Sequence, residues 1–180
     1  VGTLHRAVRM IYYAREGMLH GASGWEMFAR PHQVTFAFLS RDHPDKRFML
    51  YWLYYYFNRH CGDLALDVTG TAPWHESVNG PKTSGPITPV LVTLSDTGRE
   101  IYIIMANGSW EEDYPCNVLL ANFQVANAVG RYLSQADRDA DPLVEKEADV
   151  VKTLPIDVTG ERISFTVPAH SIIFVRLRKS

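Results

Sequence analysis

The chain has 180 residues, of which 46% are hydrophobic and 21% are charged, and its formal net charge is -2. This composition is typical of a soluble globular protein with one domain, or with one domain plus part of another. A charge so close to zero gives no reason to expect nucleic acid or an anionic membrane as a partner.

The chain enters a helical pattern almost at its first residue. Val1 is not a starting Met and no signal peptide follows it, so we expect a processed product or part of a longer protein. Apolar residues recur at steps of three and four from Leu4 to Met18, which predicts an amphipathic helix that ends near Gly21.

Two short apolar runs come next. GWEMFA, from Gly24 to Ala29, is flanked by Gly and by Arg-Pro and predicts a buried strand. VTFAFLS, from Val34 to Ser40, predicts a second extended segment of the same kind.

Every residue from Phe48 to Phe57 is apolar or aromatic, within the segment RFMLYWLYYYFNRHCG. A helix that is apolar all round must be covered on more than one side. It is too short to span a bilayer, which needs roughly 20 apolar residues, and so predicts a buried core helix and no membrane partner. Asp42 or His43 before Pro44 predicts its start, and Gly62 its end.

After Gly62, short β-branched runs alternate with turn residues and no helical pattern separates them. The clearest turns are Asp96-Thr97-Gly98, Asn107-Gly108 and Thr159-Gly160. Arg162 to Val167 alternate polar and apolar residues, which predicts one buried and one solvated face. About eight such runs predict a mainly β fold, an antiparallel, jelly-roll-like β-sandwich. Two segments predict long loops, Trp74–Pro89 and the acidic Ala136–Asp149.

The sequence therefore divides into two parts. Residues 1–62 form a helix–strand–helix unit of α/β character, and residues 63–180 form a β-sandwich of ordinary domain size. An α/β unit this small cannot bury both faces of its strand, so it needs neighbours that the sequence does not contain.

Two patterns suggest metal sites only superficially. Asp137, Asp139 and Asp141 alternate as at the start of a calcium loop, but the sixth and twelfth positions hold Pro142 and Ala148 where Gly and Glu are needed. A solvated acidic loop is the better interpretation. Several further side chains lack the spacing of a known metal motif and favour capping or surface roles, namely His20, His32, His43, His60 and Asp42. We expect no metal and no cofactor.

Cys61 and Cys116 form no CxxC pair, and they are either a disulfide or two buried thiols. Asn107-Gly-Ser109 fits the N-glycosylation pattern, but the Asn-Gly preference of a tight hairpin turn is a sufficient explanation.

Four residues are candidates for sugar contact. Trp74 and Trp110 lie in predicted turns and suit either sugar stacking or the closing of a sandwich end. Trp25 and Glu26 lie on the first predicted strand. If that strand belongs to a barrel, whose substrate cleft lies at the C-terminal ends of its strands, the indole could stack on a sugar and the carboxylate could accept hydroxyl groups. No second carboxylate can be assigned at the roughly 5 Å needed for retaining glycoside cleavage, and no Ser-His-Asp or Cys-His set is suggested. We therefore assign no catalytic residue.

The order of these parts resembles the end of a catalytic barrel in clan A glycoside hydrolases, most closely the α-L-arabinofuranosidase type. The segments that carry the resemblance are TLHRAV, FAFLS and LYYYFNRHCGD followed by LAL, in which an aromatic helix with a late His and Gly leads into a C-terminal β-sandwich. TPVLVTLSDTGREIYIIMANGSWEEDYPCNVLL and ERISFTVPAHSIIFVRLRK resemble strands of that sandwich. ARPHQ and Trp74–Pro86 show no clear family pattern.

The resemblance implies a division of roles. Leu4–His20 would be the seventh helix and Gly24–Ala29 the eighth strand of a (β/α)8 barrel, and both catalytic glutamates would lie upstream of Val1. Trp25 would line the subsite of the cleaved sugar. The chain would close the barrel of a retaining glycoside hydrolase, with the rest of that barrel and a carbohydrate substrate as partners, and would be inactive alone. Two alternatives remain, a free-standing carbohydrate-binding module and a purely structural interaction domain.

Overall fold

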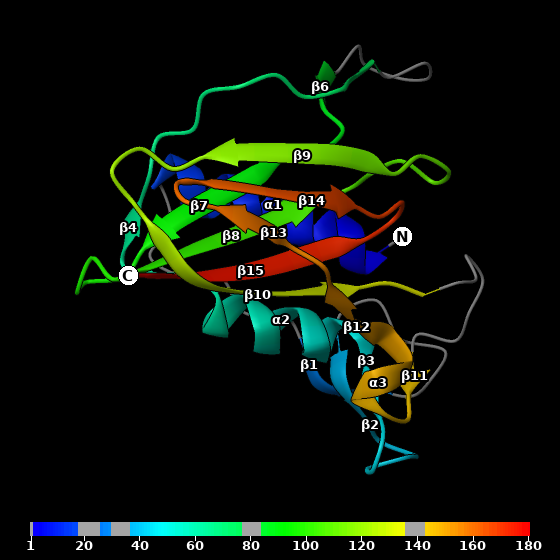
Figure 1. Cartoon of the computed structure of the whole chain (residues 1–180). Coiled ribbons are helices and arrows are strands. Elements are labelled where there is room, and N and C mark those ends of the chain that lie inside the picture. Colours follow the sequence, from blue (N-terminus) through cyan, green and yellow to red (C-terminus); the bar gives the residue numbers. More distant parts are fainter. Residues whose placement is uncertain (1, 18–25, 30–36, 77–83, 136–142) are drawn as a thin grey trace.

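Figure 1 shows a computed structural model of the chain, which describes residues 2–17, 26–29, 37–76, 84–135 and 143–180. At its centre is a six-stranded antiparallel sheet in the order β12 (Val151–Leu154), β10 (Val125–Leu133), β15 (Ile172–Lys179), β8 (Glu100–Ala106), β7 (Val90–Leu94) and β4 (Leu64–Ala65). A smaller antiparallel sheet covers one face, in the order β13 (Asp157–Thr159), β14 (Arg162–Val167) and β9 (Tyr114–Leu119). The antiparallel sandwich expected from the sequence is confirmed.

The large sheet is buried on both faces. Successive side chains of a strand point to opposite faces, and Ile173 and Val175 of β15 pack against the small sheet while Phe174, between them, packs against the helices. Strand β8 does the same with Ile103 and Ile104. These central strands are therefore continuous apolar runs, unlike Arg162–Val167, where alternating residues predicted one buried and one solvated face.

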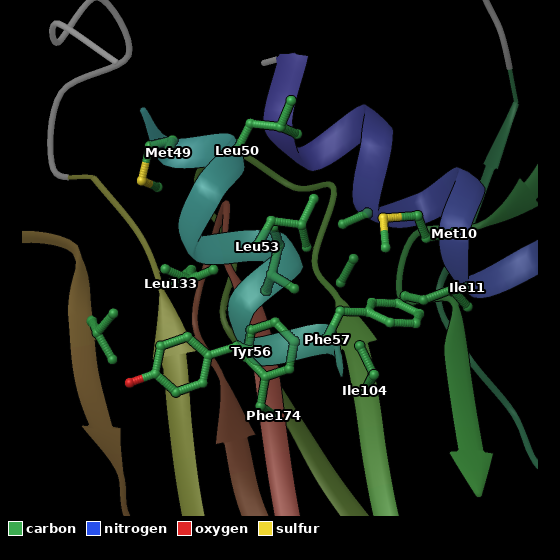
Figure 2. Packing of buried hydrophobic residues seen from close by; sticks show 14 of the residues in the cluster. Met10, Ile11, Met49, Leu50, Leu53, Tyr56, Phe57, Ile104, Leu133 and Phe174 are labelled. Carbon is green, nitrogen blue, oxygen red and sulfur yellow. The ribbon is translucent and has the colours of Figure 1, made fainter. Parts of the chain in front are cut away.

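Two helices cover the other face of the large sheet, α1 (Gly2–Glu16) and α2 (Met49–Arg59). Figure 2 shows their side chains meeting those of the strands in one cluster, which includes Met10, Ile11, Leu53, Phe57, Ile104 and Phe174. The first predicted helix thus packs on the sandwich as well as on α2. None of the described helices is long and apolar enough to cross a membrane.

The predicted start of the aromatic helix at Pro44 is wrong. The chain turns there, since the Lys46 amide donates to the His43 carbonyl at 3.0 Å. Arg47 and Phe48 then form β3, which pairs with β2 (Ala37–Ser40) and β11 (Leu143–Val144), and α2 begins at Met49. Strand pairing with distant segments therefore overrides the local helix signal.

Gly62 does not end α2, which stops at Arg59 with His60 as its C-cap residue. Gly62 instead allows a close approach between α2 and the sheet. A Cβ atom at this position would lie 2.5 Å from the carbonyl oxygen of Leu94, while the Gly62 amide donates to Thr93 Oγ1 at 2.7 Å.

Two of the three predicted turns form hairpins. Gly98 joins β7 to β8 and Gly160 joins β13 to β14, both at positive φ. The Asn107-Gly108 hairpin is wrong, because β8 and β9 belong to different sheets and residues 107–113 cross between them. Of LALDVTG, residues 64–70 and one of the short runs expected to be strands after Gly62, only Leu64–Ala65 form a strand.

Both predicted long loops contain regular structure. The first holds a hairpin of β5 (Trp74–Glu76) and β6 (Ser84–Pro86). The second, after residues 136–142, holds β11 and the short α3 (Glu147–Val150). Val144 and Val150 enter the helix-side core, and the Tyr56 hydroxyl donates to the Glu147 carboxylate. These tertiary contacts order an acidic segment that the sequence presents as solvated.

A charged group lies on the helix side of the large sheet beside the end of α2. Arg176 donates to Glu100 Oε1 from Nε at 3.1 Å and from Nη2 at 2.6 Å, and Arg178 Nε donates to the same oxygen at 2.8 Å. The Tyr102 hydroxyl donates to Oε2 at 2.5 Å. The hydrogen bonds from Arg176 above all lower the pKa of Glu100 from 4.5 to about 2.

We expect Leu53→Ala to lower the free energy of unfolding by about 2–5 kcal/mol, because it leaves a cavity between α2 and the sheet. Asn58→Ala, at an exposed position of the same helix, should change it by less than about 0.5 kcal/mol. Urea denaturation measures both. Equal losses in the two variants would mean that α2 does not pack on the sheet as described.

We also expect a pH effect from Glu100. Its pKa is lower in the folded chain than in the unfolded chain, so its carboxylate stabilises the fold above about pH 4.5 and this contribution disappears as the pH falls toward 2. The drop in unfolding free energy between about pH 5 and pH 2 should therefore be smaller in Glu100→Gln. Glu111→Gln, at an exposed loop position, should keep the full drop, and an undiminished drop in Glu100→Gln would contradict the assignment.

Candidate functional site

Trp25 and Glu26 are predicted sugar contacts, and strand β1 (Glu26–Ala29) begins at Glu26. Trp25 is outside the described residues. The backbone of Glu26 opens the strand and pairs with Ala37 of β2. Their role in binding a sugar stays a prediction.

Strand β1 belongs to a separate sheet, in which β2 and β3 contact α2. It pairs with β2 in parallel, and β3 and β11 extend this sheet with antiparallel pairing. A parallel pair is typical of α/β architecture. Strand β1 forms one edge of the described sheet, and Met27 is 58% exposed, so the predicted burial of this strand is wrong at Met27.

Helix α2 carries different side chains on its two sides. The side that faces the core contains the buried residues of the helix, which are Met49, Leu50, Leu53, Tyr56 and Phe57. The other side carries Tyr51, Trp52 and Tyr55, which are half-buried and contact one another at ring-centre distances of 5.1, 5.9 and 6.0 Å. We call these three residues the aromatic strip.

Two arginines extend the aromatic strip at its ends. The Arg47 guanidinium lies 5.6 Å from the centre of the Tyr51 ring, and that of Arg59 lies 4.2 Å from the Tyr55 ring. A guanidinium within about 6 Å of an aromatic face is attracted by the ring quadrupole. The strip is therefore a broad aromatic surface with a positive charge at each end.

Two polar atoms near the strip lack a described partner. The Trp52 Nε1 and the Tyr54 hydroxyl are buried and form no hydrogen bond with any residue that the structure describes. The Tyr54 ring packs edge-on against Phe38 of β2 at 5.0 Å. A buried donor without a partner costs about 1–3 kcal/mol, so these two groups lower the stability of the fold.

The two candidate turn tryptophans lie at one end of the sandwich. Trp74 opens β5 and is 61% exposed. Trp110 is 41% exposed, and its ring stacks on His170 at 3.5 Å with an interplanar angle of 16°. Hydrogen bonds link the two segments that carry these tryptophans. The Ile87 amide donates to the Pro73 carbonyl, and the Gly108 amide donates to the Ile87 carbonyl.

Asn107 is a buried structural residue. Its Nδ2 donates to the carbonyls of Glu112 at 2.9 Å and Val167 at 3.2 Å, and its Oδ1 accepts from the Ser109 amide at 2.9 Å. The amide is fully used inside the fold, so it is not presented for glycosylation. The Asn-Gly pair anchors the crossing between the sheets instead of forming a hairpin.

The remaining candidates are the side chains considered as metal ligands, together with the two cysteines. His20, His32, Asp137, Asp139 and Asp141 lie outside the described residues. His60 packs against Phe174 with its Nδ1 at 2.9 Å from the Tyr56 carbonyl, while Asp42 and His43 lie in an exposed bend. Across the described ranges no three His, Cys, Asp or Glu side chains gather as metal ligands. Cys61 and Cys116 are both free thiols.

The aromatic helix is predictable from the sequence, but its two different sides were not predicted. The spacing of its residues contains that signal, because Leu50, Leu53 and Phe57 recur at helical steps, as do Tyr51 and Tyr55 on the other side. Uniform hydrophobicity concealed it, since Tyr and Trp count as apolar although their polar tips favour a surface or interface.

Comparison with solved structures shows the fold of this chain within larger enzymes. A family 51 α-L-arabinofuranosidase from Bifidobacterium longum matches 98% of this chain and 34% of its own, with 16% identity and a TM-score of 0.77. The arabinose-bound GH51 α-L-arabinofuranosidase called MgGH51 matches 99% and 27%, with 19% identity and a TM-score of 0.73. The GH51 arabinofuranosidase from Xanthomonas axonopodis pv. citri matches 79% and 29%, with 18% identity and a TM-score of 0.62.

The resemblance to arabinofuranosidases expected from the sequence is thus confirmed at the level of the fold. The chain spans about a third or less of the length of these three enzymes. No protein-family model matches the sequence, and no curated protein matches it either.

Proposed function

We propose that this chain is the C-terminal portion of a retaining glycoside hydrolase that cleaves O-glycosidic bonds in plant-type polysaccharides or oligosaccharides, as an α-L-arabinofuranosidase does. Residues 1–62 close the catalytic barrel and residues 63–180 form the sandwich beside it. The observation that carries the proposal is the match of nearly the whole chain to about a third of a family 51 enzyme.

The contacts of α2 support this role. One side of the helix is buried on the sandwich, while the aromatic strip on the other side is only half-buried and the neighbouring Arg59 is exposed. The edge strand β1 and exposed Met27 also suit an added neighbour. A barrel packed there covers both, and it brings the two catalytic glutamates that this chain lacks, at the roughly 5 Å separation of retaining enzymes.

The role of this chain in catalysis is then positional. Trp25 and Glu26 lie next to the cleaved sugar, the indole as a stacking surface and the carboxylate as an acceptor for hydroxyl groups. Neither residue forms or breaks a bond.

The isolated chain should not hydrolyse para-nitrophenyl α-L-arabinofuranoside above the background rate, because no catalytic carboxylate pair belongs to it. Absorbance of released para-nitrophenol measures this, with Glu26→Gln as the matched variant. Turnover by the isolated chain that disappears in Glu26→Gln would overturn the proposal. The coding sequence upstream of Val1 gives an independent test, since it should encode barrel strands with a glutamate after the fourth and after the seventh.

A carbohydrate-binding module without catalysis is the second candidate. The observation in its favour is the exposure of Trp74 and Trp110 on segments that hydrogen bonds join at one end of the sandwich. Aromatic rings at such positions stack on sugars in many binding sites.

This second candidate predicts that Trp74→Ala combined with Trp110→Ala abolishes retardation of the chain in gels that contain soluble arabinoxylan. Val129→Ala, an exposed apolar residue on β10, is the control and should leave retardation unchanged. Retardation that survives the double substitution would exclude the two tryptophans as the binding site.

A further inference from the structure

A hollow lies on the outer surface of the small sheet, away from both helices. Its volume is about 420 Å³, within the range of roughly 300–1,000 Å³ that is usual for ligand pockets. Residues from all three strands line it, namely Asn117, Val118, Leu119, Asp157, Thr159, Arg162, Ile163 and Ser164. In Figure 1 these strands, β9, β14 and β13, lie over the side of the large sheet opposite to α1.

The register of the strands arranges the polar side chains in two adjacent rows. Asp157, Ser164 and Asn117 are cross-strand partners and form the first row. Thr159, Arg162 and Leu119 form the second, two residues along each strand and therefore on the same face. The intervening residues, such as Ile163 and Phe165, point inward into the core between the sheets. The outer face is consequently a polar surface on a rigid base.

These polar groups are not engaged by the fold. Among the described residues, no hydrogen bond or ion pair involves the side chains of Asn117, Asp157, Ser164 or Arg162. Asn107, by contrast, uses its side-chain amide in three hydrogen bonds that hold the fold together. The groups of the hollow retain their full capacity to bind a ligand.

The donor and acceptor types define the ligand. The hollow offers an amide, two hydroxyls, one carboxylate and one guanidinium, so its acidic and basic charges balance. The carboxylate of Asp157 would repel an anion, and the guanidinium of Arg162 would repel a cation. Sugar hydroxyls, in contrast, can donate to the carboxylate and accept from the guanidinium at the same time. Leu119, 60% exposed, adds an apolar contact for the C–H face of a sugar ring.

We propose that this hollow is a binding site for a neutral oligosaccharide. The lining residues include no aromatic ring on which a sugar could stack, so we expect weak affinity. It is distinct from Trp25, Trp74 and Trp110, and it does not depend on the glycoside hydrolase proposal.

The test is titration of the intact 180-residue chain with arabinohexaose, xylohexaose and cellohexaose, followed by backbone amide NMR shifts. At least one of these sugars should shift the amides of β9, β13 and β14 saturably. Asn117→Ala and Asp157→Ala should each weaken that binding tenfold or more. Thr166→Ala is the matched control, since it lies exposed on β14 but outside the hollow, and it should change the affinity less than twofold.

Three outcomes would overturn the proposal. These are the absence of saturable shifts in β9, β13 and β14 with all three sugars, unchanged affinity in both Asn117→Ala and Asp157→Ala, and tighter binding of inorganic phosphate than of the sugars at the same amides. Unfolding curves of the variants verify that the fold is intact, as expected for exposed positions. Failure of this test leaves the barrel-closing role unaffected, because the hollow lies on the opposite side of the sandwich from α2.

Discussion

The large sheet must be covered on both faces, and the rest of the structure follows from this requirement. Phe174 and Ile104 point to one side while Ile173 and Ile103 point to the other, and all four are almost completely buried. Burial of one such side chain contributes about 1.5–3 kcal/mol. The small sheet covers one face, and α1 and α2 cover the other. Both helices are therefore part of the packed structure of the sandwich. The helices and the sheet share one core.

Because α1 and α2 are committed to the sheet through one side each, the outer side of α2 is left half-buried. The aromatic strip combines half-buried rings with two flanking guanidinium groups. Such a surface suits contact with protein more than contact with water. The chain spans about a third or less of the length of the family 51 enzymes that contain this fold.

The same types of polar residue serve opposite purposes in different parts of the sandwich. Asn107 is buried and satisfies three backbone groups where the chain crosses between the sheets, so it is structural. Asn117 stands on a solvent-facing row with an exposed side chain, so it is available to a ligand. Glu100 is similarly structural, since two arginines and a tyrosine hold its carboxylate. Local sequence does not separate these roles, because each depends on which strand lies opposite.

The sequence by itself determined the mainly β fold, the buried aromatic helix and the hairpins at Gly98 and Gly160, because these depend on residue spacing and on backbone preferences that act locally. Its resemblance to arabinofuranosidases followed from the order of those elements. Only the tertiary structure decided where α2 starts, since Arg47 and Phe48 pair with strands far along the chain. It also decided that Asn107 bridges two sheets, that the acidic segment near Glu147 packs on Tyr56, and that Asp157, Ser164 and Asn117 share one row. Those features arise from contacts between distant residues, and no single stretch of sequence determines which distant strands pair.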